Sequence, residues 1–299
     1  MSVGKKILAQ GAGYLSFFFL AFTLCLYWGF DANILKPLIE DLGQKKRLKI
    51  EIQDLSLRGL AGLELKDVNI SPAQPDPEKT SDPMKIDRLV VSSSIFSLPG
   101  MIAAARTNRI PPTRVSFSLT MGTGKISGKY GIDEKSFRLD TSIKDLPLDR
   151  ITLPAYYYKD MKLAGKVNAE IKLDFPDQNR PETWNGTIEV DIDKPRLSDF
   201  QFGGVPMAGM TMEKGTLIVA IKEGNAKLNP LKLQGNDMPL SLTGTIALKQ
   251  PLGTSIVDIG GPFKFSDSYK EKNPLVSTWA PSSDKFNYKG TLSGLAPGL

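Results

Sequence analysis

The chain has no histidine and only one cysteine, Cys25, among its 299 residues. The absence of imidazole excludes Ser-His-Asp and Cys-His nucleophile pairs, and every zinc or copper site that needs a histidine ligand. A single thiol excludes an intrachain disulfide and a cysteine cluster for zinc or iron–sulfur. Chemistry based on carboxylates, lysine, tyrosine or serine remains open. The composition therefore narrows the possible enzyme classes.

The net charge of +6 is concentrated near the N-terminus. Residues 1–49 carry seven basic and three acidic side chains, a net charge of +4, whereas the rest of the chain carries 31 and 29, a net charge of +2. A basic face for nucleic acid is not indicated, and we predict no nucleic-acid partner. Hydrophobic residues make up 41% of the chain and charged residues 23%, which is typical of a folded globular protein.

An uncharged apolar run extends from Ile7 to Phe30 and is long enough to cross roughly 30 Å of hydrocarbon as a helix. Aromatic side chains stand at its far end, where they favour the membrane interface. A cleaved signal peptide is the alternative, but its apolar core is shorter and is followed by small residues. We therefore predict an uncleaved, single-pass anchor, represented by Ile7, Phe17, Phe18, Phe19, Tyr27 and Trp28.

The charges around this span leave its orientation ambiguous, because basic residues stand on both sides of it. A long downstream domain can be translocated largely regardless of charge, so we expect a short cytoplasmic tip with the rest of the chain outside the cytoplasm. The predicted divisions are a tip and anchor at 1–30, a juxtamembrane amphipathic helix at 31–48, and a β-rich domain at 49–299.

The juxtamembrane helix is predicted from apolar residues at helical spacing within residues 31–43. Gly43 is the expected stop, and Pro37 is expected to bend the helix away from the span. The following Lys45-Lys46-Arg47 cluster fits both contact with anionic lipid headgroups and a solvated charge run.

After Arg47 the apolar period changes from 3.6 to 2, which indicates strands with one apolar and one polar face. The clearest run is residues 166–174, where charged or polar residues alternate with apolar ones. We predict a mainly β fold: an elongated, curled antiparallel sheet with one or two short helices, one of them within Ile95–Arg106. The apolar face is a candidate groove formed by Val167, Ile171, Leu173, Ile188, Val190, Leu217, Val219, Ile221, Ile246 and Leu248.

A weak internal repeat places Gly-Thr-Ile or Gly-Thr-Leu at Gly186, Gly215, Gly244 and Gly290. The first two intervals are 29 residues each. We expect each glycine near a strand start, and the spacing favours stacked units of about two strands. Chance recurrence in a turn-rich β protein is the alternative.

No motif assembles a catalytic, cofactor-binding or metal site. Residues 122–128 fail the phosphate-loop pattern because Leu119 and Ile126 occupy the required glycine and hydroxyl positions, and we predict a turn. Asp174, Asp177, Asp191 and Asp193 are expected to form a solvated strand edge, and Ser282–Lys285 is expected to match Ser-x-x-Lys by chance. Asn185-Gly186-Thr187 is predicted to be a turn that enters a strand. Tyr156–Tyr158 is an aromatic run that is expected to stack on a partner or to fill a sheet face.

An anchor followed by about 250 residues of one-faced strands resembles the N protein (GspN) of the bacterial type II secretion system in its longer form, a family similar to AsmA-like membrane-anchored β proteins. The resemblance covers almost the whole chain. It is carried by strand patterns at Ile50–Ile70, Ile86–Leu98, Leu163–Val190 and Gly215–Leu248, and by Gly290-Thr291-Leu292 with Pro297.

The resemblance implies an inner-membrane anchor, a periplasmic body in a Gram-negative bacterium, and no catalytic residues. We expect a non-enzymatic component of type II secretion that acts through contacts with other secretion proteins. The alternative is an AsmA-like protein that binds or transfers lipid, because a one-faced sheet has to cover its apolar side and acyl chains could do so. An envelope enzyme based on a carboxylate pair is the third hypothesis.

Overall fold

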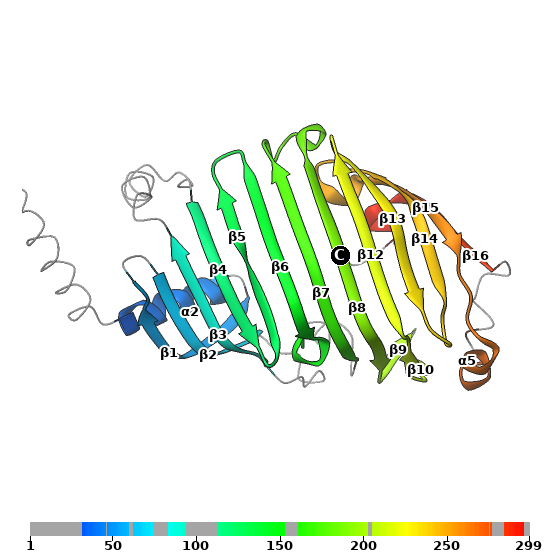
Figure 1. Cartoon of the computed structure of the whole chain (residues 1–299), viewed down its shortest axis with the longest axis horizontal. Helices are drawn as coiled ribbons and strands as arrows, with labels where there is room; N and C mark the ends of the chain where they lie inside the picture. The colour runs from blue at the N-terminus through cyan, green and yellow to red at the C-terminus, as the bar shows by residue number, and fades with distance from the viewer. Residues whose placement is uncertain are drawn as a thin grey trace, which may run out of the picture.

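The computed structural model describes residues 32–45, 47–59, 62–73, 83–93, 113–152, 161–202, 205–274, 276 and 284–295. These residues form one 14-stranded antiparallel sheet, in which neighbouring strands mostly follow one another along the chain (Figure 1). The order departs from the sequence at one place, where β12 pairs with β8 and the short β11 also pairs with β8. The prediction of a mainly β, antiparallel fold is confirmed.

The first eight strands are β1 (Leu48–Leu57), β2 (Gly62–Pro72), β3 (Met84–Ser93), β4 (Thr113–Met121), β5 (Gly124–Ile132), β6 (Phe137–Pro147), β7 (Lys162–Phe175) and β8 (Asn185–Ser198). The sheet continues with β11 (Met210–Thr211), β12 (Lys214–Lys222), β13 (Asn225–Gln234), β14 (Leu240–Ala247), β15 (Ile256–Pro262) and β16 (Lys285–Thr291). A separate hairpin is formed by β9 (Phe200–Phe202) and β10 (Val205–Met207).

Tight turns join several strands and account for their register. Between β4 and β5 the loop is Gly122-Thr123, with Gly122 at φ 57°, so the predicted turn is confirmed. Between β12 and β13 both loop residues, Glu223 and Gly224, have positive φ. Such two-residue turns follow the right-handed twist of the strands, which is why glycine occurs in them.

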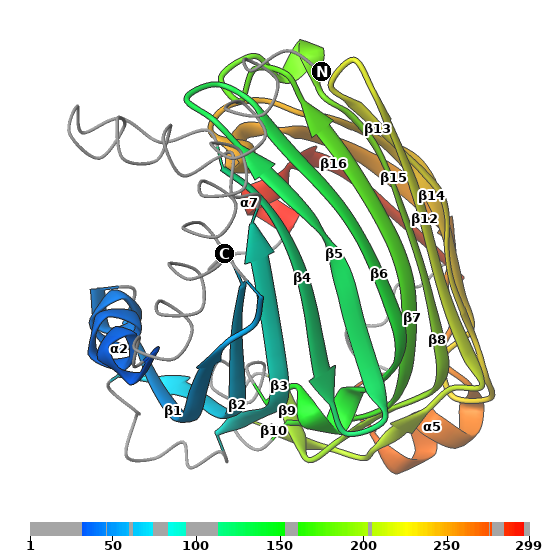
Figure 2. The ribbon, with the colours of Figure 1, turned by 60° about the vertical axis from the view of Figure 1, so that its left-hand side comes forward.

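The sheet is open, and the expectation that it curls on itself is wrong. Its pairing ends at β1 on one side and β16 on the other, and these two edges do not pair with each other (Figure 2). Each edge instead leads into a helix: η1 (Ala32–Leu35) and α2 (Lys36–Lys45) pack on β1, and α7 (Leu292–Leu295) packs on β16. The helix α2 therefore lies against the first strand, whereas α7 follows directly from the end of the last one.

The helix predicted at the start of the β-rich region is present as η1 and α2, with two corrections. Pro37 lies in the first turn of α2, where a missing N–H costs nothing, so it begins a helix and does not bend one. Gly43 does not stop the helix, which ends at Lys45. A Cβ at Gly43 would stand 2.8 Å from Ile50 Cδ1, so the glycine lets α2 approach β1 closely.

The described residues contain three short α-helices, whereas one or two were expected. The sequence pattern did not reveal α5 (Asp267–Lys272) and α7, which follow β15 and β16. The remaining single turns are η3 (Leu148–Arg150), η4 (Pro181–Thr183) and η5 (Leu252–Thr254).

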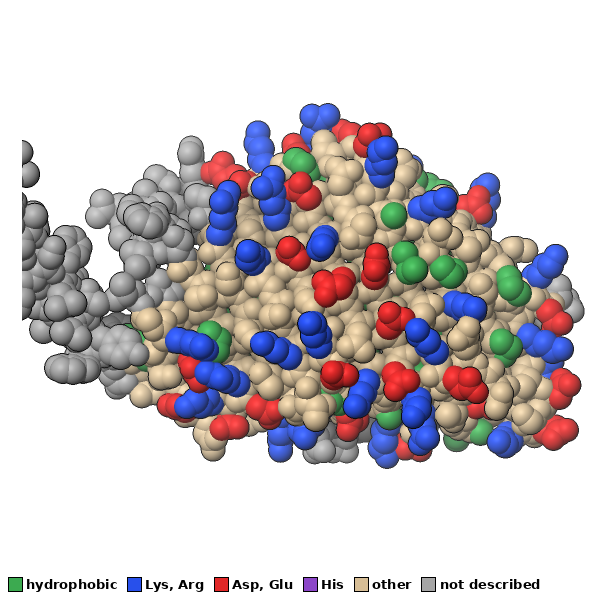
Figure 3. Space-filling model, in the orientation of Figure 1, with side chains coloured by type: hydrophobic (Ala, Val, Ile, Leu, Met, Phe, Trp, Pro, Cys, Tyr) green, Lys and Arg blue, Asp and Glu red, His purple; other side chains and the backbone are tan. Residues whose placement is uncertain are grey.

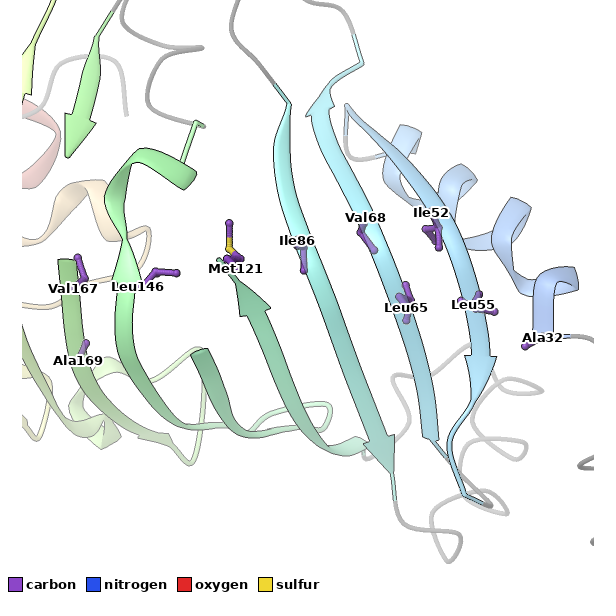
Figure 4. Close-up of a cluster of buried hydrophobic side chains, with 10 residues drawn as sticks. All are labelled: Ala32, Ile52, Leu55, Leu65, Val68, Ile86, Met121, Leu146, Val167 and Ala169. Atoms are coloured by element: carbon purple, nitrogen blue, oxygen red, sulfur yellow. The ribbon is translucent and has the colours of Figure 1, made fainter. Parts of the chain in front are cut away.

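Two clusters of buried side chains lie on this framework. The larger one runs from η1 across the strands up to β7, with all its members on one side of the sheet (Figure 4). The smaller one joins Met210 and Met212 to Tyr269 on α5 and to Val276. The core is therefore greatest at the β1 end of the sheet and at the site where α5 packs.

Several predictions fall outside the described residues: the anchor at 7–30, the helix within Ile95–Arg106, and Tyr156–Tyr158. Among the residues that the structure does describe, no helix combines the length and apolar character needed to cross a membrane.

Candidate functional site: the apolar face of the sheet

The strand register aligns apolar side chains into rows that cross the sheet. In the longest row, one aliphatic residue from each of eleven successive strands lies opposite the next. We call this the central row; its members are Leu55, Leu65, Leu89, Leu119, Ile126, Ile143, Ala169, Val190, Leu217, Leu231 and Leu242. No polar side chain interrupts it, so the one-faced pattern of each strand becomes a single apolar surface.

The structure brings together most of the ten residues predicted to form the groove. Ile171, Ile188 and Val219 lie directly opposite one another on β7, β8 and β12. Val190 and Leu217 belong to the central row, and each lies two residues along its strand from Ile188 or Val219.

The other predicted residues lie around this group. Leu173 on β7 and Ile221 on β12 both lie opposite Gly186, which is on the strand between them. Val167 lies opposite Ile192. Ile246 lies farther away on β14, separated from Ile221 by Ala226, and Leu248 follows the end of β14, outside the ladder. The candidate surface is thus continuous from β7 to β14.

Helical cover is concentrated at one end of this face. On β1, Ile52 and Leu55 are 8% and 2% exposed, beneath the side chains of η1 and α2. On β8, β12 and β13 the central-row residues Val190, Leu217 and Leu231 are only half-buried. Half-buried aliphatic side chains in a continuous array are the usual mark of a surface that binds an apolar partner.

A cavity of about 1010 Å³ extends over β3 to β8 and β12. Apolar residues of one cross-strand row line it, among them Val115, Tyr130, Leu139, Leu173 and Ile221. Charged residues of the same strands also line it: Arg114, Lys129, Arg138, Lys172, Asp140 and Asp174. These charged residues alternate with the apolar ones along each strand, so their side chains point to the opposite face of the sheet.

Four aromatic rings form a ladder on the apolar face, near one end of β5 to β8. The sequence pattern did not predict this ladder. Tyr130 meets Phe137 edge to face at 5.6 Å between ring centroids, Phe137 lies 5.5 Å from Phe175, and Phe175 stacks on Trp184 at 4.5 Å. The Trp184 indole N–H donates to the Asp177 carbonyl over 2.8 Å. The four rings come from separate segments, so only the register could place them together.

The apolar face also contains one buried hydroxyl without a partner. Thr141 on β6 is 6% exposed, lies between Gly128 and Ile171, and its Oγ1 makes no hydrogen bond. An unsatisfied hydroxyl in such a place carries a desolvation cost. It is a polar position within an otherwise apolar surface.

The opposite face is polar, and its charges of both signs are interspersed (Figure 3). Arg138 pairs with Asp174 at 2.8 Å and Lys214 with Asp191 at 3.3 Å, in agreement with the predicted solvated face. Glu64 and Arg88 approach to 2.9 Å, and this hydrogen bond lowers the pKa of the Glu64 carboxyl. Such pairs are individually weak and mainly keep the face soluble.

The remaining chemical candidates do not converge in the described residues. Asp177 lies in the turn before η4, while Asp193 is exposed on β8, and no group of three acidic side chains with metal-site geometry is found within the described part of the chain. Asn185 begins β8, as the strand-entry prediction states. Ser282 and Ser283 lie outside the described residues.

Comparison of the chain with protein-family models, with curated proteins and with solved structures finds no match.

Proposed function

We propose that the apolar face of this sheet binds the acyl chains of lipids. The observation that supports the proposal best is the central row, in which aliphatic residues succeed one another over eleven strands while those on β8, β12 and β13 stay half-buried. A sheet hydrophobic on one face has to bury that face against another layer. In the middle of this sheet the described helices supply little of that layer.

The dimensions suit extended hydrocarbon. Neighbouring strands lie about 4.8 Å apart, so ten steps along the central row span roughly 48 Å. One leaflet of a bilayer contributes roughly 15 Å of hydrocarbon, about a third of that length. Acyl chains lying across the strands would replace water along the row.

The cellular setting that we propose follows the sequence analysis: a single-pass anchor at 7–30, in the inner membrane of a Gram-negative bacterium, with residues 31–299 in the periplasm. The protein then acts by binding and not by catalysis. An anchor places the sheet beside a supply of lipid, which is consistent with the proposed ligand.

The test is to purify the full-length chain in detergent and to quantify co-purified lipid by mass spectrometry. Ile188→Lys places a charge on the apolar face and is expected to remove most of the bound lipid. Glu189→Lys places the same side chain on the polar face of the same strand and is expected to leave the lipid content unchanged. Ile188→Asn serves if the lysine variant does not fold. Lipid-free wild-type protein, or equal lipid in both variants, would overturn the proposal.

The second candidate function is that of an accessory component of type II secretion, acting through protein contacts. It rests on the resemblance of the strand patterns, and the exposed polar face of mixed charge favours it, because such a surface suits reversible protein contacts. Deleting the gene and measuring secreted exoenzymes tests it. Normal secretion would contradict it, whereas rescue by Ile188→Lys would separate this role from lipid binding.

A further inference from the structure

The sheet has two edges, and only one of them offers an uninterrupted strand. At the β1 edge, the Lys36 ammonium donates to the Gln53 carbonyl over 2.7 Å, and Asp67 on the neighbouring strand has φ 50°, which disturbs the ladder opposite Gln53. At the other edge, all seven residues of β16 pair in regular register with β15. Among the described strands, none pairs with the outer side of β16, and a regular strand edge of this kind is a template for another strand.

The ladder shows which backbone groups of β16 point outward. Just before β16 the Phe263 N–H donates to the Asp284 carbonyl, and just after it the Leu292 N–H donates to the Ser255 carbonyl. In an antiparallel pair such bonds recur at every second residue. Even-numbered residues of β16 therefore bond to β15, and the N–H and C=O groups of Asn287 and Lys289 point away from it.

We propose that β16 pairs antiparallel with β16 of a second copy of this chain, with the two-fold axis at Tyr288. In this register Asn287 of each copy lies opposite Lys289 of the other. Both are outward-facing positions, so each pair exchanges two backbone hydrogen bonds and the symmetric dimer gains four. Phe286 lies opposite the other copy's Gly290, beside which the Tyr288 ring of that copy lies.

Charge selects this register over its neighbours. A two-fold axis one residue earlier, at Asn287, would place Lys285 opposite Lys289 twice. An axis one residue later, at Lys289, would place that lysine opposite itself. Like charges directly opposite in a ladder are destabilising. With the axis at Tyr288, Lys289 faces Asn287 and Lys285 faces Thr291, so no lysine opposes another.

The pairing would join the two apolar faces. Tyr288 and Phe286 are half-buried on the same face as Ile259, their neighbour on β15, and the polar residues of β16 alternate with them. In the dimer Tyr288 lies beside its counterpart and Phe286 beside the other copy's Gly290, on the same side of one continuous sheet. A second copy thus satisfies both the hydrogen-bonding edge and the apolar row that ends there.

Two substitutions at one exposed position test the register by charge. Asn287→Lys places lysine opposite Lys289 twice per dimer, whereas Asn287→Glu places a carboxylate there. By sedimentation of the full-length protein in detergent, we expect the dimer dissociation constant to rise about tenfold for the lysine variant and to fall about tenfold for the glutamate variant. Both keep the ladder with β15, and circular dichroism checks that they fold.

A thiol cross-link tests the axis itself, in a Cys25→Ser background. Tyr288→Cys places two thiols side by side at the two-fold axis, and we expect a disulfide-linked dimer on oxidation. The matched control Lys285→Cys separates the two thiols by six residues, about 20 Å, and should not cross-link. A monomer at all concentrations, or a dimer that neither the charge variants nor Tyr288→Cys affects, would overturn the proposal. Because the readouts are mass and cross-linking, they do not depend on whether lipid binds.

Discussion

Leu173 on β7 lies directly opposite Gly186 on β8, and its side chain occupies the space that a larger residue would need. A Cβ on Gly186 would stand 2.9 Å from Leu173 Cδ2 and only 2.4 Å from the Lys172 carbonyl oxygen. The glycine of the Gly-Thr-Ile repeat therefore makes room for a neighbouring strand.

Gly186→Ala should destabilise the protein, because the contact with Lys172 is to backbone, which cannot rotate away. We expect a loss of about 2 kcal/mol in unfolding free energy, within the range for overpacked interior sites. Gly253→Ala is the control: in η5 the nearest atom to a Cβ is Ser293 Cβ at 3.6 Å, so little change is expected. Urea unfolding followed by circular dichroism measures both, and equal stabilities would contradict the steric explanation.

The same relationship corrects one prediction from the sequence. Gly186 and Gly215 lie near the starts of β8 and β12, as expected, but Gly244 lies inside β14 and Gly290 near the end of β16. What Gly186 and Gly215 share is a place opposite bulky apolar side chains, with Leu173 beside the first and Leu233 beside the second. The motif was visible in the sequence, whereas its reason requires the register.

Strands with strict alternation were predictable, and strands with a local irregularity were not. Lys166 to Asp174 alternates without a break, so β7 was identified with its correct face. By contrast, β13 contains Pro230, a residue that normally argues against a central strand. Its register shifts between Leu228 and Leu231 on both sides, and this bulge accommodates the proline. The apolar residues of β13 were therefore absent from the predicted groove.

Thr141→Val tests the unpaired hydroxyl on the apolar face. Valine has nearly the same shape and removes an oxygen that lacks a hydrogen bond, so we expect the unfolding free energy to rise by about 1 kcal/mol. Thr187→Val, at an exposed position on the polar face of β8, should change stability little. A loss of stability in Thr141→Val would show that its hydroxyl has a partner in solution.

Asn273 holds α5 against the segment before β11. Its side-chain oxygen accepts the Ala208 N–H at 2.7 Å, and its amide donates to the Tyr269 carbonyl at 3.1 Å. Because Asn273 is 5% exposed, Asn273→Ala leaves the Ala208 N–H without its partner, whereas the Tyr269 carbonyl still accepts the backbone N–H of residue 273 at 3.0 Å. We expect a loss of about 1–3 kcal/mol in unfolding free energy.

Hydrogen exchange distinguishes a local effect of this substitution from a general one. Exchange should accelerate at residues 207–212 first, while the β4–β8 strands keep their protection. Asn225→Ala is the control, since that side chain is exposed and bonds only the nearby Glu223 carbonyl. Uniform acceleration across the sheet would contradict a local role for Asn273.

Asp133 links stability to acid pH through the turn between β5 and β6. Its carboxylate accepts the N–H groups of Ser136 and Lys135 and the Ser136 hydroxyl, and these bonds lower its pKa to about 2. The pKa of this carboxyl in the unfolded chain is about 3.9, so between the two pKa values the unfolded chain binds more protons than the folded one. The stabilisation that the Asp133 carboxylate provides is therefore complete above pH 4 and is lost as the pH falls through 2. Asp133→Asn should therefore be less stable than the wild type at pH 5, with the difference shrinking towards pH 2. Asp149→Asn, exposed in η3, is the matched control in urea unfolding at each pH, and a difference that stays constant from pH 5 to 2 would contradict the linkage.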